Sequence, residues 1–299
     1  MTLLHVDLPL PAGYHPADAL AFHGRDKEQL AERVTDRTIR KGIVFDGLPV
    51  ALRIDILDTH ARCTVDAATA TTQVPPQLAA QVAEALAGML GLLIDPAPFA
   101  DAVRDDALLG PVVRRRPGLR VIQSPTIFEA LTWAIIGQQI NLTFALTLRR
   151  SFIEQAGRRH PDGLWCYPEA ADVARLTPEQ LTSRKFSRAK ADTLLRLARL
   201  VADGALPLAR DADPRDIGAR LLAVKGIGPW TVNYGLLRGW GHPDCSLHGD
   251  VAVRSAIARL AGLSAKPSLP EAETFLQAYR PHRTIAAAYL WASLDMQSG

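Results

Sequence analysis

The chain has 299 residues, of which 48% are hydrophobic, and its formal net charge is +3. This length allows one large or two ordinary domains with a substantial core, and the weak positive charge permits nucleic-acid binding without requiring it. The three cysteines are widely scattered, no apolar run of about 18 residues is present, and the N-terminus lacks the pattern of a signal peptide. These features exclude a disulfide framework and a membrane-spanning protein, and we expect a cytoplasmic protein without a membrane partner.

Alternating hydrophobic and polar residues predict an antiparallel sheet in the first part of the chain. The clearest pair of strands is joined across 57–60, where two alternating runs predict a hairpin. The candidate strands are 5–10, 35–45, 50–56 and 61–65. Proline-led stretches with helical spacing give two candidate helices, 16–22 and 75–90. Strands with helices on one face are typical of an α+β domain, and we place this first domain at residues 1–110.

A second domain, 111–299, is predicted to be almost entirely helical. The segment 111–119 with its three arginines is interpreted as the crossing between domains, either a solvated linker or a phosphate contact. Ser124 is a candidate cap for the first helix, and 161–168 is predicted to be a loop. The expected helices are 126–137, 142–155, 170–174, 178–182, 187–203, 214–224, 251–260, 269–278 and 283–295.

The stretch 221–234 predicts two helices joined by a tight turn. Gly226 and Gly228 are both free to adopt positive φ. Pro229 follows where a new helix favours proline, since that position has no intrahelical N–H bond to lose. Unpaired N–H groups at the start of this helix, next to Lys225, form a suitable site for an anion such as a phosphate.

These motifs resemble the helix-hairpin-helix superfamily of DNA glycosylases. Lys-Gly-Ile-Gly-Pro-Trp-Thr and Asn-Tyr-Gly-Leu-Leu-Arg-Gly-Trp are most similar to its alkylation-repair members, the DNA-3-methyladenine glycosylases II, and an aspartate follows the hairpin by about twenty residues. The resemblance covers almost the whole chain, most strongly 124–291. It implies a small antiparallel-sheet domain similar to half of a TATA-binding protein, followed by a mostly α-helical core whose active site lies in the interhelical cleft.

Asp250 occupies the position of the catalytic aspartate in this resemblance. It also precedes an apolar helical run, so it is a good N-cap residue, and the two roles are compatible. Cleavage of an N-glycosidic bond builds positive charge on the sugar, as in glycoside hydrolysis. A nearby carboxylate stabilises that charge and orients or deprotonates a water. Asp244 is the nearest rival carboxylate and is interpreted as a turn residue.

Two absences concern the mechanism. Relatives that also cut the DNA backbone have a lysine two residues after the second hairpin glycine, which forms a Schiff base with the sugar. Trp230 stands there in this chain, so the resemblance implies a monofunctional enzyme that uses water. No cysteine follows Cys245, so the four closely spaced cysteines of an iron–sulfur cluster are missing and no such cluster is expected.

Aromatic residues are candidates for a base-binding pocket. Trp230 and Tyr234 are four residues apart and share a helix face. The resemblance adds Trp291 and, from the first domain, Phe22. A methylated purine carries positive charge, which aromatic rings attract by stacking and cation–π forces of about 1–2 kcal/mol per contact. The alternative is that these side chains are ordinary core aromatics.

Several other residues are candidate contacts. An enzyme that flips a base out of the duplex needs a side chain to fill the gap, and the resemblance places Gln139 there, with Ile140 as a rival and Asn141 in place of the family's serine. It assigns DNA contacts to Lys225, Gly226, Ile227, Gly228 and Thr231. It also allows a Na⁺ or K⁺ ion on the carbonyls of Leu222, Val224 and Ile227, although no cofactor is required. Lys190, Arg254 and Arg184 are either phosphate contacts or solvated charges.

The sequence therefore predicts a monomeric, nucleoid-associated DNA glycosylase of bacterial type. It would remove 3-methyladenine, 7-methylguanine and similar bases from duplex DNA by base flipping and leave an abasic site. Two alternatives stay open. One is a non-catalytic protein that binds DNA structure through the same hairpin, which would leave the aromatic residues unexplained. The other is a glycosylase for another damaged base, such as an oxidised one.

Overall fold

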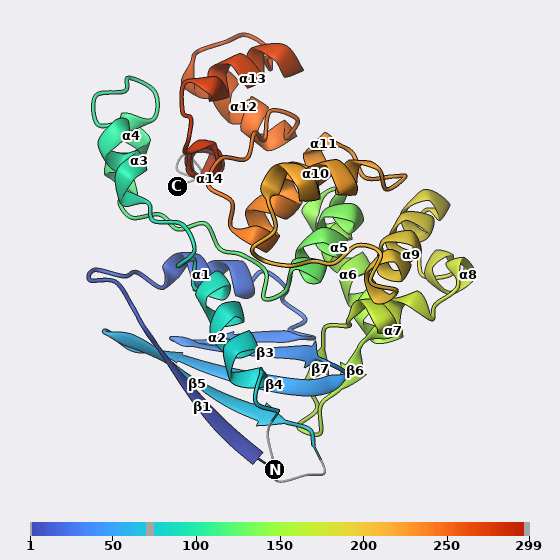
Figure 1. Cartoon of the computed structure of the whole chain (residues 1–299). Helices are drawn as coiled ribbons and strands as arrows, with labels where there is room; N and C mark the ends of the chain where they lie inside the picture. The colour runs from blue at the N-terminus through green and yellow to red at the C-terminus, as the bar shows by residue number, and fades with distance from the viewer. Residues whose placement is uncertain (1, 70–74, 296–299) are drawn as a thin grey trace.

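A five-stranded antiparallel sheet forms the first layer of the protein (Figure 1). The computed structural model describes residues 2–69 and 75–295. The strands follow the spatial order β1-β5-β4-β3-β2, and every neighbouring pair is antiparallel. Their bounds are β1 (Thr2–Pro9), β2 (Glu32–Thr35), β3 (Thr38–Phe45), β4 (Leu48–Ile56) and β5 (His60–Ala67).

The hairpin across 57–60 is confirmed, with Ile56 opposite Ala61 in the register. The single strand expected at 35–45 is wrong in part, because the chain turns back at Asp36 and Arg37 and pairs β2 with β3. Asp36 adopts a left-handed conformation with φ of 48°, which aspartate tolerates better than most residues. A two-residue hairpin turn is usually marked by glycine, and the absence of glycine here concealed the turn.

The sheet has one apolar and one polar face. Val50, Leu52 and Ile54 of β4 are completely buried, whereas Arg53 between them is exposed and bonds Asp55. Helices α1 (Ala17–His23) and α2 (Leu78–Met89) cover the apolar face (Figure 1). Both helices were predicted, because their apolar residues recur at the spacing that places them on one face.

The segment after α2 joins the larger helical part and is not a simple linker. Helices α3 (Ala97–Ala102) and α4 (Gly110–Arg115) pack there, and α4 contacts the C-terminal helix α14. Leu109, Val112 and Val113 are buried in that core. The expected crossing at 111–119 thus contains most of helix α4, which was not predicted because two valines followed by three arginines span barely one helical turn, too short a pattern to identify a helix.

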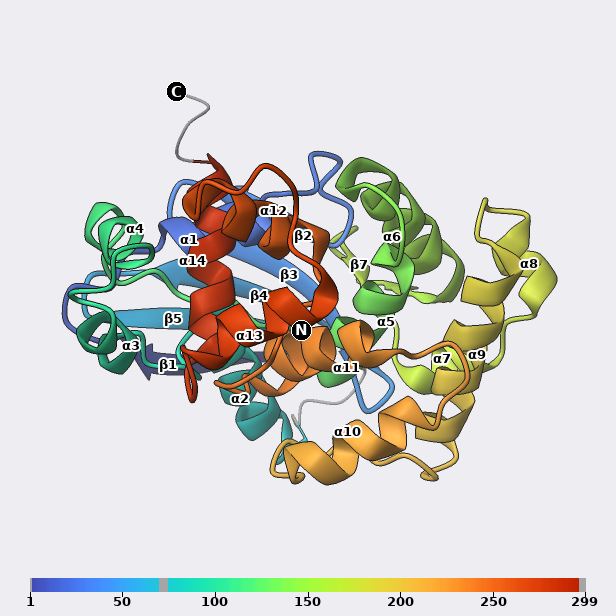
Figure 2. The ribbon, with the colours of Figure 1, turned by 90° about the horizontal axis from the view of Figure 1, so that it is seen from above.

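The remaining helices lie above the sheet and beside it (Figure 2). Their bounds are α5 (Ile127–Gly137), α6 (Leu142–Ala156), α7 (Ala170–Ala174), α8 (Pro178–Thr182), α9 (Arg188–Ala202), α10 (Pro214–Leu222), α11 (Pro229–Gly235), the π-helical η1 (Leu236–Trp240), α12 (Val251–Leu260), α13 (Leu269–Gln277) and α14 (Arg283–Asp295). Seen from above, α12 and α14 lie on one side, α6 and α9 lie on the other, and α5 lies between them. The predicted α+β class, an antiparallel sheet followed by a mostly helical part, is confirmed.

Helix α5 is the central element of this helical part. Every residue from Ile127 to Ile136 is buried. The cap is Thr126, whose Oγ1 accepts the N–H of Glu129 at 3.1 Å. The prediction of Ser124 as the cap was wrong by two residues, because Pro125 lies before the cap and not in the first turn.

A short hairpin ties the helical part to the sheet. β6 (Arg158–Arg159) pairs with β7 (Trp165–Cys166), and β7 lies within 161–168, which was expected to be a loop. The N–H of Tyr167 then donates to the carbonyl of Gly42 in β3 at 3.0 Å. A Cβ on Gly42 would lie 2.2 Å from the carbonyl oxygen of Trp165, so this close approach requires glycine.

Buried charges lie where the sheet meets the helices. The ammonium of Lys41 in β3 lies 2.7 Å from Glu129 of α5 and 3.2 Å from Glu32 of β2. Arg149 of α6 pairs with both carboxylates, at 2.7 and 3.1 Å. All four side chains are at least 97% buried. Within 2–69 and 75–295, no helix is long and apolar enough to cross a bilayer.

Candidate active site

The predicted helix-turn-helix is present at 214–235. Gly226 has a φ of +99°, and a Cβ there would lie 2.0 Å from Oγ1 of Thr193 in α9. Gly228 instead has an extended conformation, with φ of −107°, and caps α11 ahead of Pro229. The turn therefore uses positive φ at one of the two expected glycines, because a single left-handed residue is enough to reverse the chain.

Asp250 is the N-cap of α12, as predicted. Its Oδ1 accepts the N–H of Val253 at 3.0 Å. Two indole N–H groups also donate to it: Trp230 to Oδ2 at 3.1 Å and Trp291 to Oδ1 at 3.1 Å. Three donors from α11, α12 and α14 therefore fix the orientation of this carboxylate. The rival Asp244 instead pairs with Arg283, at 2.6 Å.

An aromatic slot lies beside Asp250, in the cleft between α5, α11 and α14. The rings of Trp230 and Tyr234 are stacked with centroids 5.1 Å apart, and those of Tyr234 and Trp291 are 6.4 Å apart and tilted. The slot encloses a cavity of about 420 Å³ lined by Trp133, Ala134, Gly137, Ile140, Leu142, Ala145, Trp230, Tyr234, Arg238, Asp250, Ala252 and Trp291. The structure thus brings together the three pocket aromatics predicted from the second domain.

Two further side chains belong to this region and were not predicted. Trp133 of α5 donates its indole N–H to the hydroxyl of Tyr234 at 3.2 Å, and Arg238 lines the cavity. Phe22 does not line it; its ring lies behind the slot, with the guanidinium carbons of Arg25 and Arg238 at 3.8 and 4.8 Å from its centroid. The packing of Trp133 on the opposite side of the slot depends on contacts between residues about a hundred positions apart, which local spacing does not reveal.

The candidate wedge loop between α5 and α6 is held against the hairpin. Nε2 of Gln138 donates to the carbonyl of Gly226 at 3.1 Å and to Oγ1 of Thr231 at 2.9 Å. The next residue, Gln139, is exposed and left-handed, with φ of 55°. Asn141 caps α6 by accepting the N–H of Phe144 at 2.9 Å. Loop and hairpin together line a second opening of about 770 Å³ that also reaches Asp250.

The predicted DNA-contacting residues differ in whether their side chains are exposed and free to bind a phosphate. Lys225 is exposed, but the side chains of Ile227 and Thr231 are 5% and 2% exposed. A contact from Ile227 or Thr231 is therefore restricted to the backbone. Lys190 is engaged elsewhere, because its ammonium donates to the carbonyl of Ile136 at 2.7 Å and burial lowers its pKa. Arg254 likewise donates its Nε–H to the carbonyl of Pro267 at 2.7 Å.

The proposed cation ligands lie at the end of α10 and in the turn. The carbonyl of Val224 accepts the N–H of Ile227 at 3.0 Å. A carbonyl oxygen has two lone pairs, so one stays available for a cation at Val224. Across the described part of the chain, no cluster of histidine, cysteine, aspartate and glutamate has the arrangement of a metal site.

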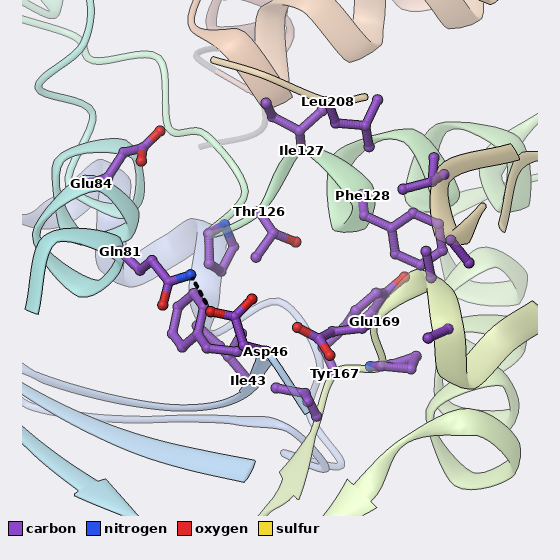
Figure 3. A pocket seen from close by; sticks show the side chains of 18 of the residues that line it. Ile43, Asp46, Gln81, Glu84, Thr126, Ile127, Phe128, Tyr167, Glu169 and Leu208 are labelled. Carbon is purple, nitrogen blue, oxygen red and sulfur yellow. Dashed lines mark hydrogen bonds between the residues drawn. The ribbon is translucent and has the colours of Figure 1, made fainter. Parts of the chain in front are cut away.

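Another cavity, of about 620 Å³, lies between the edge of the sheet and helices α5 and α7 (Figure 3). None of the predicted site residues lines it. Its polar groups bond to one another or to the backbone: Gln81 donates to Asp46 at 2.9 Å, Glu169 accepts the N–H of Gly47 at 2.8 Å, and Glu84 pairs with Arg210. Burial raises the pKa of Glu169. These bonds hold the sheet against the helices.

Comparison with known proteins places the chain in a family. The model of the HhH-GPD superfamily base excision DNA repair proteins matches residues 132–281. Over 292 residues the chain is 28% identical to the "DNA-3-methyladenine glycosylase" of Bacillus subtilis, covering 96% of each chain. A 3-methyladenine DNA glycosylase from Archaeoglobus fulgidus has the same fold, with a TM-score of 0.82 at 20% identity over 98% of this chain and 99% of that chain.

A glycosylase/lyase for 8-oxoguanine from Clostridium acetobutylicum also has this fold, with a TM-score of 0.71 at 13% identity over 99% of this chain and 98% of that chain. The hairpin, the capping aspartate and the adjacent aromatic slot define a helix-hairpin-helix protein of DNA repair. The chain belongs to the HhH-GPD superfamily of base excision DNA repair proteins. The resemblance indicated by the sequence motifs is thereby confirmed.

Proposed function

We propose that the protein is a monofunctional DNA glycosylase that removes alkylated bases from duplex DNA and leaves an abasic site. The observation that carries this proposal is the carboxylate of Asp250, which two indole N–H groups hold at 3.1 Å beside an aromatic slot. The slot is large enough for a purine, and a carboxylate beside it is near the sugar of a base bound there. Named relatives that act on 3-methyladenine support the same substrate class.

The aromatic slot suits a base that carries positive charge. Methylation at adenine N3 or guanine N7 makes the purine cationic, and Trp230, Tyr234 and Trp291 present their rings around the cavity. Stacking and cation–π attraction act on any such ring, without requiring one pattern of hydrogen bonds. This tolerance suits a range of alkylated purines and agrees with the substrate named for the relative from Bacillus subtilis.

Asp250 acts on the sugar and on water. As the C1′–N bond breaks, its negative charge stabilises the oxocarbenium-like sugar. The carboxylate also accepts the proton of the water that attacks C1′. Trp230 stands where lyases have their Schiff-base lysine, and its indole N–H donates to Asp250. Hydrolysis by water, without cleavage of the DNA backbone, is therefore the reaction that these residues support.

The wedge loop and the hairpin form the DNA-binding surface. Exposed Lys225 and the first N–H groups of α11 contact a backbone phosphate, which positions the protein without selecting a sequence. A monovalent cation on the carbonyls of Leu222, Val224 and Ile227 would reinforce this contact. Gln139 enters the gap left by the flipped base, since it is exposed at the tip of the loop that Gln138 fastens to the hairpin.

An oxidised base is the second candidate substrate, because a glycosylase/lyase for 8-oxoguanine has the same fold. Trp230 at the lysine position argues against that enzyme's lyase chemistry. Duplexes containing 7-methylguanine and 8-oxoguanine would separate the candidates, with release expected from the first.

The test of the proposed chemistry is base release by wild type and by Asp250→Asn. Asparagine retains the oxygen that caps α12, so circular dichroism should show an unchanged fold, whereas the negative charge is lost. Asp213→Asn is the matched control, because Asp213 caps α10 in the same way, accepting the N–H of Asp216 at 3.1 Å. We expect loss of release only for Asp250→Asn. Equal release by all three proteins would refute the role of Asp250. If wild type binds alkylated duplex DNA but releases no base, the protein is a non-catalytic DNA-binding protein and the proposed function is rejected.

A further inference from the structure

Two arginines lie behind the aromatic slot. Cζ of Arg238 is 5.4 Å from the ring centroid of Trp291 and 5.7 Å from that of Tyr234, and Arg238 lines the cavity itself. Cζ of Arg25 lies 4.7 Å from the centroid of Trp133. Both guanidinium groups also contact the ring of Phe22. The π faces at the back of the slot are therefore already occupied by cations.

Neither arginine has an acidic partner. In the part of the chain that the structure describes, no carboxylate lies within ion-pair distance of Arg25 or Arg238. Arg238 donates one Nη1–H to the carbonyl of Ile122, but its Nε–H is buried without a hydrogen-bond partner. Burial lowers the pKa of Arg25; the charge of Glu32 opposes this effect, and the charges of Arg149 and Arg238 add to it. Both side chains are partly buried, and positive charge held beside aromatic rings without a carboxylate at ion-pair distance is a feature that needs an explanation.

The leaving base provides that explanation. When the C1′–N bond breaks, both bonding electrons go to the base nitrogen, while the water oxygen bonds to C1′ and its proton goes to Asp250. A cationic base such as 7-methylguanine leaves as a neutral molecule. A neutral base leaves with one negative charge, until it takes a proton from solvent. A fixed guanidinium stabilises this second kind of leaving group and repels the first kind of bound base.

We propose that Arg238 is a specificity-determining residue that shifts the selectivity of the slot from cationic towards neutral purine bases. The guanidinium of Arg238, which lines the cavity, and the charge it shares with Arg25 act on the carbonyl and ring-nitrogen acceptors of the departing base. Guanidinium hydrogen bonds to anionic acceptors are among the strong ones. This inference rests on the proposed glycosylase function, and it adds an electrostatic preference that aromatic stacking alone does not supply.

The test compares two substrates in one enzyme. Duplexes containing hypoxanthine, a neutral purine with a carbonyl acceptor, and 7-methylguanine, a cationic purine, are cleaved under single-turnover conditions by wild type and by Arg238→Met. Methionine keeps part of the apolar stem and removes the charge. We expect the ratio of the two kcat/KM values, hypoxanthine over 7-methylguanine, to fall at least about tenfold, since loss of one such donor typically costs a factor of 10² or more.

Arg238→Lys keeps the charge without the planar fork and should restore part of the ratio, which a merely structural role would not do. Arg188→Met removes an exposed guanidinium on α9 and should leave the ratio as in wild type. An unchanged ratio for Arg238→Met, including an equal fall in both kcat/KM values, would overturn the inference. Base release by wild type would in that case still support the proposed function. Release of 7-methylguanine but not hypoxanthine by wild type would also overturn the inference. Release of neither would instead reject the proposed function.

Discussion

The indole N–H of Trp291 donates to Oδ1 of Asp250 at 3.1 Å, from a helix that begins more than thirty residues after the aspartate. The indole of Trp230 makes the equivalent bond to Oδ2. The same rings that form the slot therefore also orient the carboxylate beside it. Recognition of the base and placement of the negative charge are therefore coupled. A displacement of either indole changes the shape of the slot and also the position of the Asp250 carboxylate.

Trp230→Phe and Trp291→Phe separate these two roles. Phenylalanine retains an aromatic face and loses the N–H that bonds Asp250. A hydrogen bond to a charged group contributes about 1.5–3 kcal/mol, so we expect kcat for 7-methylguanine release to fall roughly ten- to a hundredfold with a smaller change in KM. Trp133→Phe is the matched control, since its N–H donates to the neutral hydroxyl of Tyr234; an equal fall for Trp133→Phe would contradict the prediction.

Gln139 and Ile140 are rival wedge residues, and their surroundings predict different behaviour. Gln139 is exposed, whereas Ile140 lines the slot. A wedge acts only where a base pair must be opened, and unpairing a base costs a few kcal/mol. We expect Gln139→Ala to slow release of a paired 7-methylguanine about tenfold more than release of one opposite an abasic site. Ile140→Ala should slow both; the reverse pattern would make Ile140 the wedge.

Much of the site could be predicted because its signals are local. Gly226 and Pro229 mark a turn and a helix start, Asp250 is followed by an apolar helix, and Trp230 and Tyr234 are separated by about one helical turn. These local structures required only neighbouring residues and a standard backbone geometry, whereas the roles of Asp250 and of the aromatic rings came from the resemblance to the glycosylases. The same reasoning identified most helices and the β4–β5 hairpin, where the hydrophobic period is clear.

What the sequence could not provide are contacts between distant segments. Arg238 lies within the sequence Asn-Tyr-Gly-Leu-Leu-Arg-Gly-Trp, but none of its neighbours indicates that its guanidinium contacts the ring of Phe22 without a carboxylate partner. Thr231 was predicted to contact DNA through its position in the hairpin, yet Gln138 from another helix occupies its hydroxyl. Lys41 lies within an alternating strand and gives no sign of complete burial. Such features depend on which elements meet in three dimensions.

The buried charges between sheet and helices predict a large loss of stability for Lys41→Met. This change leaves Glu32 and Glu129 with one shared cation, Arg149, in a site closed to water. Removing one partner of a buried ion pair costs about 3–5 kcal/mol, which urea denaturation would measure. Arg53→Met on the polar face of the sheet removes a half-exposed ion pair and should cost at most about 1 kcal/mol. Similar losses for the two variants would show that the buried network contributes little.

The same cluster predicts how stability depends on pH. Burial alone would raise the pKa of Glu32, but the charges of Lys41 and Arg149 outweigh it and hold the pKa well below its usual range. The unfolded state then binds more protons than the folded state in acid, so the stability supplied by Glu32 is present above its unfolded pKa, about 4.3, and is lost as the pH falls below that value. Glu32→Gln should be less stable at pH 7 and lose less free energy of unfolding on acidification. An acid profile parallel to that of wild type would contradict this assignment.

The two hairpin glycines make a matched pair for the last prediction. Gly226→Ala places a side chain at φ of +99° with its Cβ 2.0 Å from Oγ1 of Thr193, and the backbone strain alone costs about 1–3 kcal/mol. Gly228 is extended, and a Cβ there would have no neighbouring atom within 4 Å. Gly228→Ala should stay within about 1 kcal/mol of wild type, because reduced freedom of the unfolded chain offsets the loss of a favoured cap residue.

Thermal denaturation would give the two stabilities, and binding of an abasic duplex would report on the hairpin surface. We expect Gly226→Ala to weaken that binding as well, because the carbonyl of Gly226 accepts the N–H of Gln138 and a shift of the turn displaces the wedge loop with it. If Gly226→Ala is as stable as Gly228→Ala, helix α9 must shift to accommodate the new methyl group without a measurable loss of stability. In that case the contact between Thr193 and the hairpin does not fix the position of the turn.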